Sequence, residues 1–98
     1  MPSPAPVGDL LGRQWIESEK DFRGTWTRRG TSNVFDAVWE GGYQAVLTMT
    51  LIGNNVRIVR QGADATCRYD GTILGNQASG QYTCTSFSGI GTWAAEIR

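Results

Sequence analysis

The sequence contains no histidine, and this absence excludes several kinds of active site. Serine and cysteine triads that depend on an imidazole base are ruled out, as are metal sites built on histidine. Two cysteines are too few for a structural zinc site. Catalysis would depend on carboxylates, but Asp36 and Asp70 have outward-facing parity and Glu40 falls in a turn. No two acids have the spacing that glycoside hydrolysis needs, so we predict that the protein is not an enzyme.

Long apolar segments are also missing. No run approaches the roughly 20 consecutive apolar residues that span a bilayer, so we expect no membrane insertion. Residues 1–20 lack the basic start and apolar centre of a secretion signal, so the chain is either cytosolic or a mature exported form. Prolines and small residues over 1–8 favour the exported form, because they are typical of a spacer behind a cleaved signal or lipid anchor. We expect a disordered lead-in over 1–8, one domain over 9–98, and a periplasmic or secreted location.

An excess of charge of either sign is absent as well. Nine lysines and arginines balance nine aspartates and glutamates, which removes the general attraction to nucleic acid that a basic domain has. We therefore expect no nucleic-acid partner. Asp64 and Asp70, with Thr66 between them, lack the dense alternation of a calcium loop, so neither a metal nor another cofactor is predicted.

Residues 22–98 contain short runs of β-branched and aromatic residues with a period of two, broken by glycine and asparagine. This pattern predicts about seven strands. Their predicted ranges are 22–28, 33–39, 43–51, 56–61, 66–74, 78–85 and 91–97. Every connection is short, so strands adjacent in sequence should pair antiparallel, as in a meander. The pattern predicts a small all-β barrel, with a curled sandwich as the alternative, because closure removes the exposed edges of an open sheet.

The segment before the first predicted strand has a different pattern. Asp9 can act as an N-cap, and Leu11 and Trp15 fall on one face of a helix over 9–20. Gly12 weakens this pattern because glycine disfavours helix interiors. The sequence thus allows a short N-terminal helix before the barrel.

The two cysteines fall opposite each other in the predicted sheet. The Gly-Asn dipeptide at 75–76 suits a two-residue hairpin turn, which places Leu74 opposite Gln77. Leu74 and Gln77 form a hydrogen-bonded pair, and the pairs further from the turn alternate, beginning with one that lacks backbone hydrogen bonds. Cys67 and Cys84 form one of the pairs without these bonds. Side chains are closest at these sites, so we predict a disulfide; the alternative is a reduced pair that packs in the core.

The same counting predicts which side chains share the buried face. A loop at 40–42 pairs Trp39 with Tyr43 and keeps Phe35 and Leu47 on one side of the sheet. The predicted core consists of Phe22, Trp26, Phe35, Ala37, Trp39, Ala45, Leu47, Met49, Leu51, Val56, Ile58, Tyr69, Ile73, Tyr82, Trp93, Ala95 and Ile97. Such short strands enclose too little volume for a deep ligand cup, so a binding site should lie at a barrel mouth or on an outer face.

Gly24, Thr25 and Trp26 on the first predicted strand, with Arg98 after the last, resemble the lipocalin and avidin superfamily pattern. In that pattern a first-strand tryptophan packs under a basic residue from the last strand. The chain is shorter than a typical member, so the ligand pockets of that superfamily are not carried over. The stretch at 24–39, GTWTRRGTSNVFDAVW, is more closely similar to a class of small exported bacterial proteins of unknown function. That resemblance implies a periplasmic or surface setting and no particular activity.

The densest cluster of polar and aromatic side chains lies around 28–33, between the first two predicted strands. The candidate ligand-binding residues are Arg28, Arg29, Ser32, Asn33 and Phe35. Guanidinium and amide groups beside aromatic rings can clasp a sugar, a carboxylate or a peptide end. The alternative is an ordinary turn, in which Ser32 or Asn33 bonds its own backbone and Gly30 takes a positive φ.

We expect a non-catalytic binding or interaction module whose partner is a small polar ligand, a carbohydrate or another protein. The alternative is a structural domain that forms a homodimer through an outer sheet face or edge; the sequence leaves open whether the protein is a monomer or a homodimer. For the homodimer, the outward valines would form a continuous apolar stripe. These valines are Val34, Val38, Val46 and Val59. Phe87 and Ile90, in the last loop, can either form an exposed docking tip or fold back and plug the barrel end.

Overall fold

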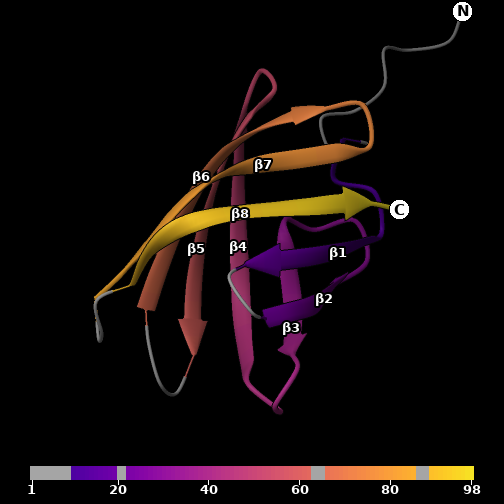
Figure 1. The fold of residues 1–98 in the computed structure, drawn as a ribbon. Coiled ribbons are helices and arrows are strands. Elements are labelled where there is room, and N and C mark those ends of the chain that lie inside the picture. The colour runs from indigo at the N-terminus through magenta and orange to yellow at the C-terminus, as the bar shows by residue number, and fades with distance from the viewer. Residues whose placement is uncertain (1–9, 20–21, 63–65, 86–88) are drawn as a thin grey trace, which may run out of the picture.

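The computed structural model describes residues 10–19, 22–62, 66–85 and 89–98; the lead-in predicted over 1–8 and the predicted N-cap Asp9 lie outside them. The described residues form a closed antiparallel barrel in which each strand pairs with the next and the last returns to the first (Figure 1). Its strands are β1 (Gln14–Glu19), β2 (Phe22–Arg28), β3 (Val34–Trp39), β4 (Gln44–Ile52), β5 (Asn55–Gly62), β6 (Thr66–Leu74), β7 (Gln77–Cys84) and β8 (Gly89–Ile97). The predicted meander barrel is confirmed, with one strand more than expected.

The N-terminal helix predicted over 9–20 is wrong, because the described part of this segment contains β1. This strand pairs with β2 on one side and with β8 on the other. Trp15, Glu17 and Glu19 all face the interior and are buried. Without β1, β2 and β8 would have unpaired edges, so closure of the barrel outweighs a weak local preference for helix. None of the described segments contains a helix long and apolar enough to cross a membrane.

The turns set the strand registers as predicted. The bounds of β2 and β6 are those expected from the sequence, and the other predicted strands differ by one or two residues. The loop after β3 gives the predicted pairing, with Phe35 opposite Leu47. Leu74 lies opposite Gln77, and Gly75 between them has a φ of +62°, which glycine adopts at little cost.

The predicted disulfide is confirmed. Cys67 and Cys84 are opposite each other on β6 and β7, with their Cα atoms 4.0 Å apart, and are bonded. The two cysteines are 17 residues apart in sequence, and a bond that closes a loop of this size contributes on the order of 3 kcal/mol to stability in the chain-entropy view. For a domain of this size that is a large share of the total. A disulfide fits a location outside the reducing cytoplasm.

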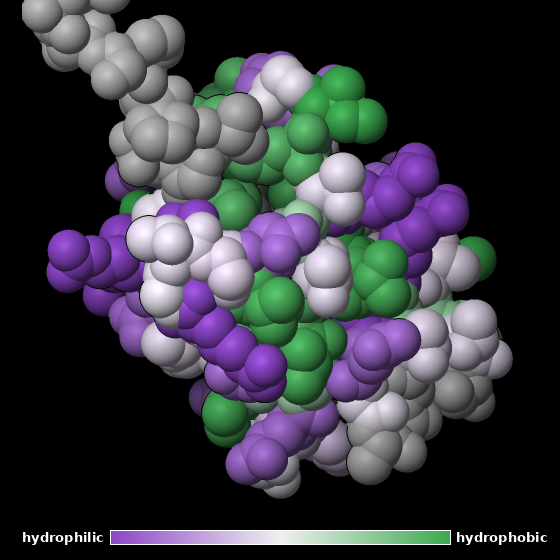
Figure 2. All heavy atoms as spheres, turned by 180° about the vertical axis from the view of Figure 1, so that it is seen from behind, coloured by the Kyte–Doolittle hydropathy of each residue, from purple (hydrophilic) through white to green (hydrophobic). Residues whose placement is uncertain are grey.

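On the face of the barrel seen in Figure 2, apolar side chains gather in patches that polar and charged side chains surround. All four valines predicted to face outward do so. Val38 and Val59 are exposed, whereas Val34 and Val46 are half-buried. Val46 lies opposite Asp36 on the neighbouring strand, so a charged side chain interrupts the apolar row.

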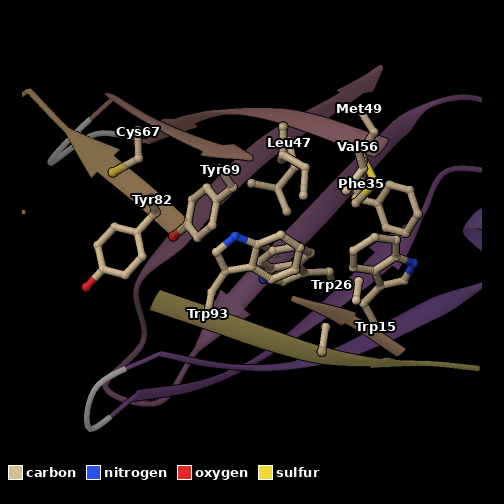
Figure 3. Close-up of a cluster of buried hydrophobic side chains, with 14 of the residues drawn as sticks. Trp15, Trp26, Phe35, Leu47, Met49, Val56, Cys67, Tyr69, Tyr82 and Trp93 are labelled. Atoms are coloured by element: carbon tan, nitrogen blue, oxygen red, sulfur yellow. The ribbon is translucent and has the colours of Figure 1, made fainter. Parts of the chain in front are cut away.

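Aromatic rings fill the interior of the barrel (Figure 3). Trp15 and Trp26 stack with ring centroids 5.6 Å apart, and Trp93 lies 5.9 Å from Trp26. Tyr69 meets the same indole edge-on at 5.7 Å. Gly71 makes room for this packing, since a Cβ atom there would stand 2.7 Å from Cζ2 of Trp93. These rings occupy the space that a ligand would need inside the barrel.

The predicted core is correct except at its margins. Phe22 is 42% exposed, because β2 begins at the rim of the barrel and the ring packs edge-to-face against Tyr43 outside it. Leu51 is only partly buried, next to the tip of the β4–β5 hairpin. The remaining predicted core residues are buried.

The contact that marks the lipocalin and avidin pattern is not formed. Trp26 lies on β2, the second strand, and is fully enclosed. The Arg98 guanidinium is exposed and donates to Glu96 through Nε at 3.0 Å. The closed antiparallel barrel is therefore the only part of that resemblance that the structure supports.

Candidate functional site

The two ends of the barrel differ in chemistry, and each is a candidate site. The Arg28 end, as we name it, carries the loops at 29–33, 53–54 and 75–76. The Glu19 end is the opposite one, where β1, β3, β5 and β7 finish. The binding loop predicted from the sequence belongs to the first end.

At the Arg28 end, the Arg28 side chain binds backbone carbonyls. Its Nε and Nη2 donate to Ser32 O at 2.6 Å and to Thr31 O at 2.8 Å, within its own loop. Its Nη1 donates to Gly12 O at 3.0 Å, which ties the loop to the segment before β1. Arg28 thus holds the shape of this end.

The other polar residues predicted to bind are also engaged within the protein. Arg29 forms a two-point ion pair with Asp36, at 2.8 and 2.6 Å, and holds the pKa of that carboxyl below its usual range. The Ser32 hydroxyl donates to Arg29 O at 2.6 Å. Asn33 donates through Nδ2 to Met49 O at 2.8 Å. These contacts, with a φ of +57° at Gly30, are those of the ordinary-turn alternative.

Phe35, the fifth predicted binding residue, is fully buried in the barrel core. It packs edge-on against Trp15, with ring centroids 6.0 Å apart. The structure therefore gathers four of the predicted residues in one loop and places the fifth on the inside of the wall beneath them. Its ring is a support for this end rather than a contact surface.

A hollow of about 480 Å³ opens at the Arg28 end. Its apolar lining comes from Leu11, Met49 and Leu51. Its polar lining comes from Arg28, Thr31, Ser32, Asn33 and Thr50. An apolar floor with a hydrogen-bonding rim is the usual composition of a small-molecule site.

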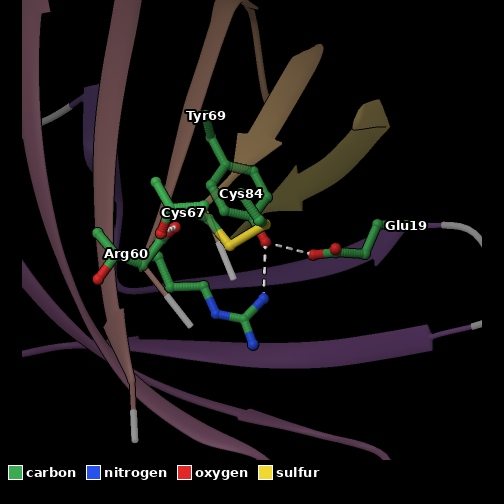
Figure 4. Close-up of a disulfide and its surroundings, with 7 residues drawn as sticks. Glu19, Arg60, Cys67, Tyr69 and Cys84 are labelled. Carbon is green, nitrogen blue, oxygen red and sulfur yellow. Dashed lines mark hydrogen bonds between the residues drawn. A yellow bond between two sulfur atoms is a disulfide. The ribbon is translucent and has the colours of Figure 1, made fainter. Parts of the chain in front are cut away.

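At the Glu19 end, charged side chains are buried inside the barrel next to the disulfide (Figure 4). Glu17, Glu19 and Arg60 are all more than nine-tenths buried. The Tyr69 hydroxyl donates to Glu19 Oε1 at 2.6 Å and accepts from Arg60 Nη1 at 3.0 Å. Arg60 also lies over the ring of Trp39, with Cζ 4.0 Å from the ring centroid. Hydrogen bonds thus link the carboxylate of Glu19, the phenol of Tyr69 and the guanidinium of Arg60 in series.

Glu17 lies deeper in the same cluster. It accepts a hydrogen bond from Trp39 Nε1 at 2.9 Å. Burial, with the neighbouring Glu19, raises the pKa of Glu17 from 4.5 to about 9. Glu17 is therefore protonated at neutral pH. Burial and the charge of Glu19 likewise raise the pKa of Tyr69, which stays a neutral donor.

Three buried polar atoms have no hydrogen-bond partner among the described residues: Glu17 Oε2, Arg60 Nε and Trp26 Nε1. Each such group costs about 1–3 kcal/mol when it is removed from water without a partner. Natural proteins keep few of them, and those that persist call for a specific explanation. The Glu19 end thus carries polar groups that an apolar core would not need.

Sequence reasoning missed this cluster, although part of the signal was present. Arg60 has the same parity as Val56 and Ile58, two residues predicted to face inward. Glu17 and Glu19 alternate with outward residues after Trp15, but the helical interpretation of that segment hid the alternation. Their burial together depends on pairing between strands far apart in the chain.

The outer surface of the barrel has further features. A groove of about 780 Å³ runs over β4 to β7, and Asp70 in it binds both Arg57 and Arg68. Asp36 and Glu40 are exposed, as predicted. Ile90 is 76% exposed and does not plug the barrel, whereas Phe87 lies outside the described residues. No group of three metal-ligating side chains occurs in the described ranges.

Comparison of the chain with protein-family models, with curated proteins and with solved structures gives no match. The two barrel ends, with their different chemistry, are therefore the guide to function.

Proposed function

We propose that this protein is a non-catalytic binding module of the periplasmic or secreted space, and that it holds a small polar ligand in the hollow at the Arg28 end. The observation that carries the proposal is the pairing of an apolar floor with a hydrogen-bonding rim on a rigid frame. The floor residues Leu11 and Met49 are buried and fixed by the core. A preformed site of this kind loses little conformational entropy on binding.

The chemistry of the rim suits a neutral or weakly acidic ligand with several hydroxyl or amide groups. Thr31 and Thr50 present short side chains capable of donating and accepting at the opening. The Arg28 guanidinium supplies positive charge beside them. A monosaccharide matches this mixture of apolar ring face and hydroxyl groups, and we take it as the first ligand class to test.

The test is an NMR titration of the ¹⁵N-labelled protein with glucose, N-acetylglucosamine and glucuronate. We expect saturable shifts at Leu11, Thr31 and Met49. Thr31→Trp, which would fill the hollow, should remove them. Thr92→Trp, the same substitution at an exposed position on β8, should leave them unchanged. Absence of saturable shifts, or shifts unaffected by Thr31→Trp, would count against the site.

The alternative function is assembly as a homodimer through the outer face. Its support is the exposure of Val38 and Val59. The carboxylate of Asp36 within the valine row weakens it, because an apolar interface would have to desolvate that charge and its partner Arg29. Light scattering at low micromolar concentration distinguishes the binding module from the homodimer. A dimer that persists at this concentration and dissociates in Val38→Glu would support assembly.

A further inference from the structure

The Glu19 end has a feature that ligand binding at the opposite end does not explain. Two carboxyl groups, Glu17 and Glu19, lie two residues apart on one strand and face the same interior. The only buried cation among the described residues is Arg60. Two ionised carboxylates would therefore compete for one guanidinium in a site of low dielectric constant.

The groups that face Glu17 come from the surrounding strands. They are Glu19 of β1, Trp39 of β3, Arg60 of β5 and Tyr82 of β7, and Tyr69 of β6 joins the cluster through its bonds with Arg60 and Glu19. On β2 and β8, its direct neighbours are Gly24 and Ala95, which have no ionisable side chain. The charge balance of the cluster thus depends on whether Glu17 carries a proton.

We propose that the buried cluster of the Glu19 end is a proton-controlled latch, in which the proton on Glu17 keeps β1 joined to β5 and β6 and its loss loosens these contacts. With Glu17 neutral, the single charge of Glu19 is matched by Arg60 through the Tyr69 hydroxyl. With Glu17 ionised, a second negative charge faces Glu19, and water must enter to solvate it.

The unpartnered atoms indicate where the change begins. Glu17 Oε2 and Arg60 Nε have no hydrogen-bond partner within the described ranges. Ionised Glu17 would attract Arg60 away from the Tyr69 hydroxyl, which holds Glu19 to the opposite wall. The raised pKa of Glu17 places this change in the mildly alkaline range, near 9.

The experiment follows the Glu17 side-chain carboxyl carbon by ¹³C NMR over a pH titration of the intact protein. We expect its midpoint near pH 9, with a matching shift of the Trp39 indole N–H signal. Over the same range the hydrogen-exchange protection of the Trp39 indole should fall about tenfold or more, whereas that of Trp15 at the other end should hold.

Glu17→Gln keeps the shape of the side chain but cannot ionise, so protection of the Trp39 indole should become independent of pH in this range. Glu96→Gln, at an exposed glutamate on β8, is the matched control and should behave like the parent protein. A Glu17 midpoint below about pH 6 would overturn the proposal. Loss of protection that persists in Glu17→Gln would do the same, and the carboxyl titration decides alone if that variant fails to fold. Neither result bears on sugar binding at the Arg28 end.

Discussion

Arg28 and Arg60 show how the same side chain acts differently at the two ends of the barrel. Arg28 lies near the surface and binds backbone carbonyls, so its charge remains close to water. Arg60 is buried over an indole ring and is joined to a carboxylate through a phenol. The Arg28 end can therefore tolerate changes in charge, whereas the Glu19 end depends on a balance between positive and negative charges that water does not screen.

The largest expected effect breaks that balance directly. Arg60→Ala would leave Glu19 buried without its cation, and removal of one partner from a buried pair typically costs about 3–5 kcal/mol. Urea unfolding should show this loss in the free energy of unfolding. Arg29→Ala, at the exposed ion pair of the other end, should change it little. Equal effects of the two variants would contradict the distinction between the ends.

Loss of the disulfide should rank next. Replacement of Cys67 and Cys84 by serine is expected to cost about 3 kcal/mol. Because the bond joins β6 and β7 beside Tyr69, hydrogen exchange should rise first at the Glu19 end. Hydrogen exchange of the parent protein, measured with and without reductant, is the control for the serine variant. Uniform loss of protection along the barrel would show that the bond stabilises the whole fold rather than this end.

The pH dependence of stability should follow Glu17. Its folded pKa of about 9 lies above its ordinary value of 4.5, so the folded protein retains a proton that the unfolded chain has lost. The free energy of unfolding contributed by this group is complete at acidic pH and declines as pH rises between these two values. Glu17→Gln should flatten the decline and raise stability near neutral pH by on the order of 1–3 kcal/mol. Thermal unfolding across this range measures it, and an unchanged slope would refute the assignment.

A smaller effect is expected from Arg28→Lys. A lysine keeps the charge but cannot reach Ser32, Thr31 and Gly12 with a planar fork, so about 1–2 kcal/mol of hydrogen bonding should be lost. Urea unfolding gives the value. NMR shifts should change around Thr31 and leave the Trp39 indole signal in place; a response at Trp39 would mean that the ends are coupled.

The β6–β7 hairpin shows what could be predicted and why. A Gly-Asn turn and the alternation of side chains fix each pair from the turn outward, so the opposition of Cys67 and Cys84 follows from local geometry alone. Phe22 shows the limit of that method: its parity is inward, but the barrel ends there and the ring turns outside. The position of a residue in the alternation predicts to which side of the sheet its side chain points. Whether that side chain is buried depends on which strands lie across the barrel from it.

The candidate sites divide in the same way. The loop at 28–33 was predicted, yet its polar groups bind the protein itself, and the hollow beside it also needs Leu11 and Met49 from other elements. The buried cluster was not predicted at all. A charged residue in a sequence is normally predicted to be exposed, because burial of an unpaired charge in the core costs too much free energy.

The hairpin registers, the disulfide and most of the core follow from local sequence, because each depends on a turn and on alternation over a few residues. Tertiary structure decided that β1 is a strand, since it closes the barrel only by pairing with β8 at the other end of the chain. It also decided that Glu19 meets Tyr69, 50 residues away in sequence, and Arg60 beside it. Burial of those charges requires β1 to lie across the barrel from the paired strands β5 and β6, and a local sequence pattern carries no information on contacts over that separation.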